Sequence, residues 1–292
     1  MTNPEVLPTA RAGLSPRRQA LRNPQAVFGA LILAVMLLAA VLAPLLAPFD
    51  PSQQDLSRVL EGPSSRHLLG TDDIGRDVLS RILYGGRVSL SIGVAATLVG
   101  ALTGVPLGLA AGYFGGALDA VVRLLTDTLL AFAGGALLGL TFVAVFGPSM
   151  GTIILATAIG IMPQFIRLAR GQALLIREQT YVEAAALFGL SGRKVIQRHI
   201  LPNSIGPILV FAMINVGLSV VIASGFGFLG LGIQSPQIEW GTMLGESRSQ
   251  IFNAGHVAAA SGMAIFLFAL GANLVGDGLR DLIDPRTKER HA

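Results

Sequence analysis

The most regularly spaced ionisable residues are Asp119, Arg123 and Asp127, which recur at every fourth position. On a helix this spacing places the three side chains on one face, where opposite charges pair. Ionisable side chains at membrane depth are functional by default, but this stripe lies near the end of an apolar run. Two interpretations therefore stay open: an ion-pair ladder, or the lining of a pathway or gate.

Three uncharged polar residues, Asn215, Ser219 and Ser224, lie within a later apolar run. Polar side chains in such a run commonly form hydrogen bonds between helices. The alternative is that they face a transport pathway.

Residues typical of catalysis or metal binding are sparse. The chain has no cysteine, no GxxxxGK[ST] phosphate-binding loop and no nucleophile–base pair in register. Its four histidines lack the spacing of metal ligands. We therefore expect a protein that is not an enzyme and that has no metal or cofactor of its own. The histidines are His67, His199, His256 and His291.

Thr180 and Glu183 are spaced as a capping box, in which each side chain bonds the backbone amide of the other residue. The pattern predicts a short helix from Tyr181 to Phe188, and Gly189 is placed to end it in a left-handed conformation. Its apolar surface is either a docking surface for another chain or part of an ordinary packed loop. The surface consists of Val182, Ala184, Ala185, Leu187 and Phe188.

A second short helix is predicted from Gly192 to about Ile200, with Ser191 as its N-cap. We expect this helix to stop before Pro202, because proline cannot continue a helical hydrogen-bond ladder. The two helices would form a compact helix–turn–helix lying against the membrane.

The composition places these elements in a membrane. Hydrophobic residues make up 52% of the 292 positions and charged residues only 13%, against about 25% charged in soluble domains. The net charge of +4 is a weak sign of nucleic-acid binding, so we expect lipid contacts and no nucleic acid. We predict an all-α membrane protein with six transmembrane helices. They are Ala26–Leu46, Val88–Gly112, Val121–Phe146, Met150–Ile166, Ile205–Leu229 and Val257–Val275.

Two of these runs carry further signals. The first follows a lead of about 25 residues and exceeds the length of a signal-peptide core, which favours a retained anchor over a cleaved signal peptide. The second places four glycines on one face, which predicts close packing against another helix; the alternative is a helix that slides during transport. These glycines are Gly100, Gly104, Gly108 and Gly112.

The basic residues predict the orientation. With a cytoplasmic N-terminus, fifteen of the 21 lysines and arginines fall in cytoplasmic segments. We therefore expect both termini in the cytoplasm. The predicted organisation is a cytoplasmic segment 1–25, a first helix 26–46, an extracytoplasmic loop 47–87, a five-helix core 88–279 with a cytoplasmic loop 167–203, and a cytoplasmic tail 280–292.

Three stretches, in the right order, resemble one family. EAAALFGLSGRKVIQRHILPN resembles the EAA loop of bacterial ABC-importer permeases, while HLLGTDDIGRDVLSRILYGGRVSLSIG and NLVGDGLRDLIDPR resemble its dipeptide/oligopeptide/nickel branch. The resemblance implies type I ABC-importer permease architecture with a cytoplasmic EAA coupling helix, in a bacterial inner membrane. The matching positions of the EAA loop are Glu183, Ala184, Ala185, Gly189, Leu201 and Pro202.

The resemblance also implies partners. These are a second homologous permease, two ATPase subunits that bind ATP and Mg, and an extracytoplasmic substrate-binding protein. Glu183 would cap and orient the coupling helix, Gly189 would allow its tight exit, and Ala184 and Ala185 would fit a groove on the ATPase. The expected cargo is a di- or oligopeptide; nickel or another small solute is the alternative, and a secondary transporter is the runner-up class.

Two features qualify the resemblance. The third run reads Leu130-Ala-Phe-Ala133 where that branch usually has Phe-Pro, so a bend there would come from Gly134 and Gly135 instead. The segments 50–87 and 234–253 would face the binding protein. Trp240 in the second segment is equally suited to anchor the chain at the membrane interface.

Overall fold

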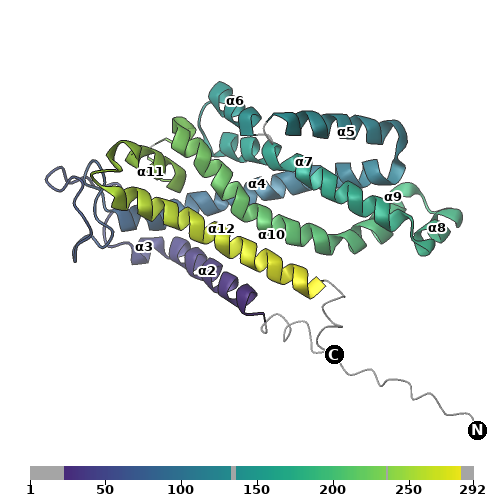
Figure 1. The fold of residues 1–292 in the computed structure, drawn as a ribbon, viewed down its shortest axis with the longest axis horizontal. Helices are drawn as coiled ribbons and strands as arrows, with labels where there is room; N and C mark the ends of the chain where they lie inside the picture. The colour runs from purple at the N-terminus through teal and green to yellow at the C-terminus, as the bar shows by residue number, and fades with distance from the viewer. Residues whose placement is uncertain (1–22, 133–135, 235, 284–292) are drawn as a thin grey trace, which may run out of the picture.

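The computed structural model describes residues 23–132, 136–234 and 236–283, and within these ranges the chain is helical without a β-strand. Figure 1 shows an elongated bundle whose long helices run roughly along one axis. This arrangement confirms the predicted all-α class. The elements are α2 (Pro24–Val41), α3 (Ala43–Leu46), α4 (Val78–Phe114), α5 (Gly116–Ala131), α6 (Ala136–Phe146), α7 (Met150–Arg177), α8 (Thr180–Leu187), α9 (Gly192–Val195), η2 (Ile196–Ile200), α10 (Leu201–Phe226), η3 (Gly227–Leu231), α11 (Trp240–Glu246), η4 (Ser247–Gln250) and α12 (Gly255–Ile283).

Five helical stretches among the described residues are long and apolar enough to cross a membrane. The predicted third run, Val121–Phe146, is divided between α5 and the short apolar helix α6. The expected bend at Gly134 and Gly135 lies outside the described residues. The five stretches are Pro24–Val41, Val78–Phe114, Met150–Arg177, Gly192–Leu231 and Gly255–Leu282.

Two helices extend well beyond their predicted limits. α4 begins at Val78 rather than Val88, because the Asp77 carboxylate accepts a hydrogen bond from the Ser80 backbone amide at 2.8 Å and caps the helix. α7 continues past Pro163 and Ile166 to Arg177, so the first part of the predicted cytoplasmic loop is helical. Both extensions contain arginines, so the apolar pattern of the sequence did not predict that these residues belong to the helices.

The glycine stripe of α4 packs against α7, as predicted. A β-carbon at Gly104 would lie 2.9 Å from the Met162 carbonyl oxygen, and one at Gly112 would lie 2.6 Å from that of Arg170. The absence of side chains therefore lets the two backbones approach closely. α4 and α7 form the centre of the bundle, and α10 packs against both.

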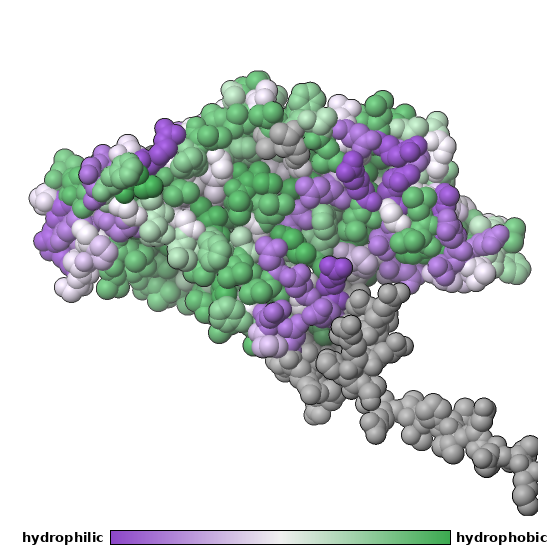
Figure 2. Space-filling model, viewed as in Figure 1, coloured by the Kyte–Doolittle hydropathy of each residue, from purple (hydrophilic) through white to green (hydrophobic). Residues whose placement is uncertain are grey.

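The start of the first described helix lies beside the end of the last one. α12 packs against α2 and α10, and the Asn23 side-chain amide, which also caps α2, donates to the Asp281 carboxylate at 2.8 Å. Figure 2 shows hydrophobic side chains over the middle of the bundle, with hydrophilic side chains gathered toward the helix ends. This distribution is typical of a membrane protein.

Trp240 has neither of the two predicted surface roles. Its side chain is buried, its indole nitrogen donates to the Ile82 carbonyl at 2.9 Å, and its backbone amide donates to Ser89 Oγ at 3.1 Å. Gly85 and Gly86 leave the space that the indole fills. Trp240 therefore fastens α11 to the first turns of α4.

Candidate coupling site and polar residues

The helix that carries the EAA residues lies at one end of the bundle. Figure 1 shows α8 and α9 projecting at the end opposite α11. The end of α7 that leads into α8 is fixed to α4, because the Arg177 guanidinium donates to the carbonyls of Gly112 and Tyr113 at 3.0 and 3.4 Å. The hairpin formed by α8 and α9 is therefore anchored to α4 where it begins.

The predicted capping box is wrong. α8 begins at Thr180, so the extended N-cap residue is Gln179, and no side-chain hydrogen bond caps this helix. A capping box needs an extended backbone at its first residue, whereas Thr180 is already helical. The Glu183 side chain is exposed, and the structure records no hydrogen bond from it to another described residue. Ser191 does occupy the N-cap position of α9, but its side chain forms no capping bond.

The left-handed end predicted at Gly189 is confirmed. Gly189 has φ +86°, its amide donates to the Ala186 carbonyl at 3.0 Å, and the Leu190 amide donates to the Ala185 carbonyl at 3.2 Å. These two bonds form a Schellman motif, which satisfies carbonyls that the helix end leaves free. Gly189 therefore turns the chain sharply from α8 toward α9.

One side of α8 packs within the chain and the other does not. Val182 is buried in a cluster with Val195 and Ile200, whereas Leu187 is 82% exposed and Phe188 is 86% exposed. Ala184 and Ala185 are half-buried. The hairpin therefore presents two large apolar side chains at its tip, supported by a packed inner face.

The predicted end of the second short helix before Pro202 is wrong, because the helical stretch that starts at Gly192 continues through Pro202. Residues 192–231 form one continuous helical stretch, in which Leu201 donates to the Ile196 carbonyl across the wide turn η2. A π-type turn accommodates the proline by changing the local hydrogen-bond register. Leu201 and Pro202 thus continue the hairpin directly into α10.

Asn203 of α10 connects that helix to α8, a role that the sequence did not indicate. Its side-chain amide donates to the His199 carbonyl at 2.6 Å and to the Tyr181 hydroxyl at 3.3 Å. The Tyr181 and His199 rings also lie close, with centroids 6.1 Å apart. These residues meet only because the chain folds back on itself between α8 and α10.

The polar stripe of α5 forms ion pairs, mainly with α7. Asp119 pairs with Arg170 through two hydrogen bonds and with Arg123 at 3.2 Å, and the Asp127 carboxylate accepts from Arg167 at 2.8 Å. The pairing favours the ladder interpretation, with most partners on the neighbouring helix. Asp127 and Arg167 are both exposed, so that pair also lies on the surface of the chain.

The polar residues of α10 are buried and do not form one cluster. Ser219 Oγ lies 3.0 Å from Thr97 Oγ1 on α4, which is the predicted interhelical hydrogen bond. The Asn215 amide donates to the Phe211 carbonyl of its own helix at 2.9 Å. Asn215 Oδ1 and Ser224 Oγ are buried without a partner among the described atoms.

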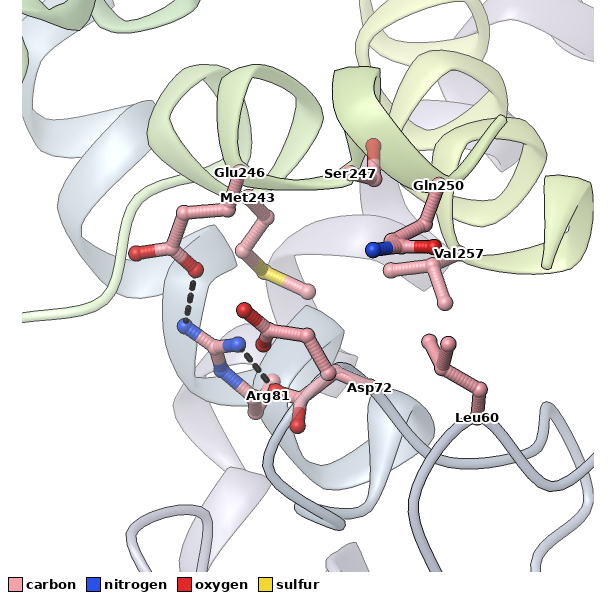
Figure 3. A pocket seen from close by; sticks show the side chains of 9 residues that line it. Leu60, Asp72, Arg81, Met243, Glu246, Ser247, Gln250 and Val257 are labelled. Atoms are coloured by element: carbon pink, nitrogen blue, oxygen red, sulfur yellow. Dashed lines mark hydrogen bonds and ion pairs between the residues drawn. The ribbon is translucent and has the colours of Figure 1, made fainter. Parts of the chain in front are cut away.

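An ion-pair cluster at the opposite end was not predicted. Figure 3 shows Arg81 of α4 between Asp72 of the preceding loop and Glu246 of α11, and Arg76 pairs with the same two carboxylates. The adjoining cavity of about 10 Å³ has room for at most one water molecule. Burial and the neighbouring Asp72 charge raise the pKa of Asp73 at its edge. The cluster therefore fastens the loop to α11 and is not a ligand site.

Glu239 is a second buried group that the sequence did not single out. Its carboxylate accepts hydrogen bonds from the Gly241 amide at 3.3 Å and the Thr242 hydroxyl at 3.0 Å. Burial raises its pKa, and these hydrogen bonds oppose that effect. A β-carbon at Gly227 would lie 2.9 Å from the carboxylate, so glycine is needed where η3 begins.

Comparison with known proteins adds to this geometry. Residues 104–289 match the family described as binding-protein-dependent transport system inner membrane component, and residues 16–63 match the N-terminal TM domain of oligopeptide transport permease C. The chain is 44% identical to the glutathione transport system permease protein GsiD of Pectobacterium atrosepticum, over 93% of this chain and 90% of the relative.

Two further relatives cover similar shares. The dipeptide transport system permease protein DppC of Alkalihalophilus pseudofirmus is 41% identical, over 94% of this chain and 91% of the relative. The probable D,D-dipeptide transport system permease protein DdpC of Escherichia coli K12 is 40% identical, over 90% and 88%. Together with its apolar helices, these matches show that the chain belongs to the binding-protein-dependent transport system inner membrane components, a family of multi-pass ABC-transporter permease subunits rather than enzymes.

Proposed function

We propose that this chain is one permease subunit of an ATP-driven importer for di- or oligopeptides. The peptide and glutathione transport named for its relatives supports this substrate class. A second homologous permease completes the pathway, two ATPase subunits bind ATP and Mg, and a substrate-binding protein delivers the peptide from outside. This chain supplies a membrane path and a mechanical link to the ATPases.

The outer ends of the first and last described helices support a sixth membrane crossing. Because Asn23 bonds Asp281, the first and last apolar helices begin and end at the same side of the bundle. A chain with both ends on one side crosses an even number of times, so the five long spans need one more. α5 and α6 follow one another along α7 and together supply this crossing (Figure 1).

The charges support a cytoplasmic location for that side. α8, α9 and η2 lie at one end of the bundle (Figure 1), and most of the basic residues of the core fall in these elements and in the adjoining parts of α5 and α7. The positive-inside rule favours the cytoplasm for such an end. The ion-pair cluster around Arg81 and the loop 47–77 then face outward, where the binding protein docks. The N- and C-terminal segments follow as cytoplasmic.

The observation that carries the proposal is the exposure of Leu187 and Phe188 on a rigidly supported hairpin. A large apolar side chain at a helix tip is most stable when another protein covers it. We assign α8 as the coupling helix, with Ala184 and Ala185 at the rim of the contact. Glu183 lies on the exposed face, where it can contact the ATPase instead of capping its own helix.

The remaining candidate residues take supporting roles in this proposal. Gly189, Leu201 and Pro202 direct the coupling helix and join it to α10, so movement of the hairpin reaches the membrane core. Buried Asn215 and Ser219 lie further along that helix. The exposed pair of Asp127 and Arg167 belongs to the ion-pair ladder between α5 and α7, with Arg123 nearby on α5, and its position on the surface would let it open as a gate at the inner end of the pathway.

Two matched substitutions test the coupling role. Phe188→Ser removes an exposed apolar side chain from the residue that caps the end of α8, and Leu45→Ser removes one from α3, where Leu45 is 82% exposed. We expect Phe188→Ser to release the ATPase subunits during purification in mild detergent and to abolish ATP-dependent peptide uptake, while Leu45→Ser retains both. Full retention of ATPase subunits and uptake by Phe188→Ser would refute the role of α8.

A further inference from the structure

An open cleft of about 410 Å³, lined by both apolar and polar residues, lies near the end of the bundle opposite α8. Its walls come from the residues after α3, the second and third turns of α4 and the segment that leads into α11. The volume is in the range of sites for small organic ligands, which includes a di- or tripeptide. The lining residues relevant here are Asp50, Ser52, Tyr84, Arg87, Gln237 and Ile238.

The walls of this cleft are held in place by specific contacts. The Phe49 amide donates to Ser80 Oγ at 3.2 Å, which fixes the loop against α4. The Ser52 amide donates to the Asp50 carboxylate at 2.7 Å and orients it. On the other side, Gly85 allows close approach of Ile238 and Trp240, so the segment before α11 lies directly on α4.

The cleft carries one positive and one negative side chain. The structure records no ion pair or hydrogen bond from the Arg87 guanidinium to another described residue, and Arg87 is exposed. The second oxygen of the Asp50 carboxylate also has no recorded partner within the described ranges. Both charges are therefore available to a ligand, beside the hydroxyl of Tyr84 and the amide of Gln237.

We propose that this cleft is an outer receiving site for a short peptide with free termini. Arg87 binds the peptide's α-carboxylate through its planar guanidinium, and Asp50 binds the α-ammonium group. Tyr84 and Gln237 offer hydrogen bonds to the peptide amides. The inference rests on the proposed orientation, which places the cleft where a binding protein releases its cargo.

Cysteine labelling tests the site directly, because the natural chain contains no cysteine. Ser52→Cys places a thiol in the cleft, and Ser65→Cys makes the same change on an exposed part of the loop that does not line it. The complete transporter, in right-side-out membrane vesicles washed free of binding protein, is treated with a membrane-impermeant maleimide. Trialanine should slow labelling at position 52 and leave position 65 unchanged.

A second pair of variants tests the chemistry of recognition. In the Ser52→Cys chain, Arg87→Gln should weaken protection by trialanine about tenfold, the loss expected for one charge-assisted hydrogen bond. Arg66→Gln, a change at an exposed arginine in the loop before α4, should have no effect. Trialanine with a C-terminal amide should protect poorly, and Arg87→Gln should remove the difference between the acid and the amide.

The outcomes separate this inference from the proposed function. Labelling from outside at both cysteines, without protection by trialanine, would overturn the receiving site and leave the orientation intact. Labelling at both positions only in inverted vesicles would overturn the orientation on which both proposals rest. Labelling at position 52 in the isolated chain but not in the complete transporter would show that a partner subunit fills the cleft, which also overturns the site.

Discussion

The Arg81 guanidinium on α4 lies 3.1 Å from the Glu246 carboxylate on α11, although 165 residues separate them in the chain. The same guanidinium pairs with buried Asp72 of the preceding loop. Arg81 therefore connects three segments: the loop, the start of α4 and the short helix before α12. Trp240 also fastens α11 to α4, so several independent contacts hold this end of the bundle together.

Arg81 and its partner Glu246 should contribute differently to stability. Arg81→Ala leaves Asp72 buried with fewer partners, and we expect it to lower the free energy of unfolding by about 3 kcal/mol. Glu246→Gln changes a carboxylate that is 40% exposed, and we expect a loss of at most about 1 kcal/mol. Thermal unfolding of the purified chains in detergent measures both, and equal losses would contradict the assignment of Arg81 as the central residue.

The glycine stripe gives a prediction about helix packing. Gly108→Ala would place a methyl group against the Ile166 carbonyl and 2.8 Å from the Ala169 β-carbon, so we expect destabilisation of about 1–3 kcal/mol. Gly171→Ala in α7 is the control, because nothing lies within 4 Å of its β-carbon position. It should be neutral or stabilise the chain by up to about 1 kcal/mol. A neutral Gly108→Ala in thermal unfolding would show that the two backbones are not in close contact.

The effect of replacing Gly189 should depend on whether the new residue tolerates a left-handed backbone, rather than on the size of its side chain. Its φ of +86° disfavours most residues, but no atom lies within 4 Å of a β-carbon there. Gly189→Val should therefore distort the exit from α8 and uncouple ATP hydrolysis from uptake, while leaving membrane insertion intact. Gly189→Asn, which tolerates a left-handed backbone, should retain coupling. Peptide-stimulated ATPase activity and uptake in proteoliposomes measure both variants, and normal coupling in Gly189→Val would refute this role of the turn.

Glu239 predicts a dependence of stability on pH. Its folded pKa lies above the ordinary value of 4.5 because of burial. Between the unfolded and folded pKa values the folded chain binds more protons, so its stability falls as pH rises through that window and stays lower above it. Glu239→Gln removes this contribution. Unfolding temperatures from about pH 4 to about pH 8 should decline more in the parent chain than in the variant, and parallel curves would contradict the prediction.

Local patterns predicted the features that depend on a few neighbouring residues. The glycine stripe of α4 follows directly from four-residue spacing, and the left-handed end at Gly189 follows from glycine after a helix-forming run. The capping box at Thr180 was wrong because the helix begins one residue away from the position that the motif requires. Pro202 was misread because a π-type turn changes the hydrogen-bond register before it.

Long-range contacts were beyond such patterns. Trp240 looked like a surface aromatic, yet its surroundings come from α4, more than 150 positions earlier. Arg81 and Arg170 looked like loop charges that end a helix, but carboxylates from other segments neutralise them and allow α4 and α7 to extend. The pairing of Asn203 with Tyr181 likewise needs the folded hairpin.

The most direct test of the coupling role uses single cysteines in this cysteine-free chain. Phe188→Cys and Leu45→Cys are compared in the assembled transporter, each treated with a short bifunctional maleimide, with one cysteine engineered on the α8-facing groove of the ATPase. We predict a covalent adduct between the permease and the ATPase from position 188 and none from position 45. An adduct from position 45, or none from position 188 in a complex that hydrolyses ATP, would contradict the assignment of α8 as the coupling helix.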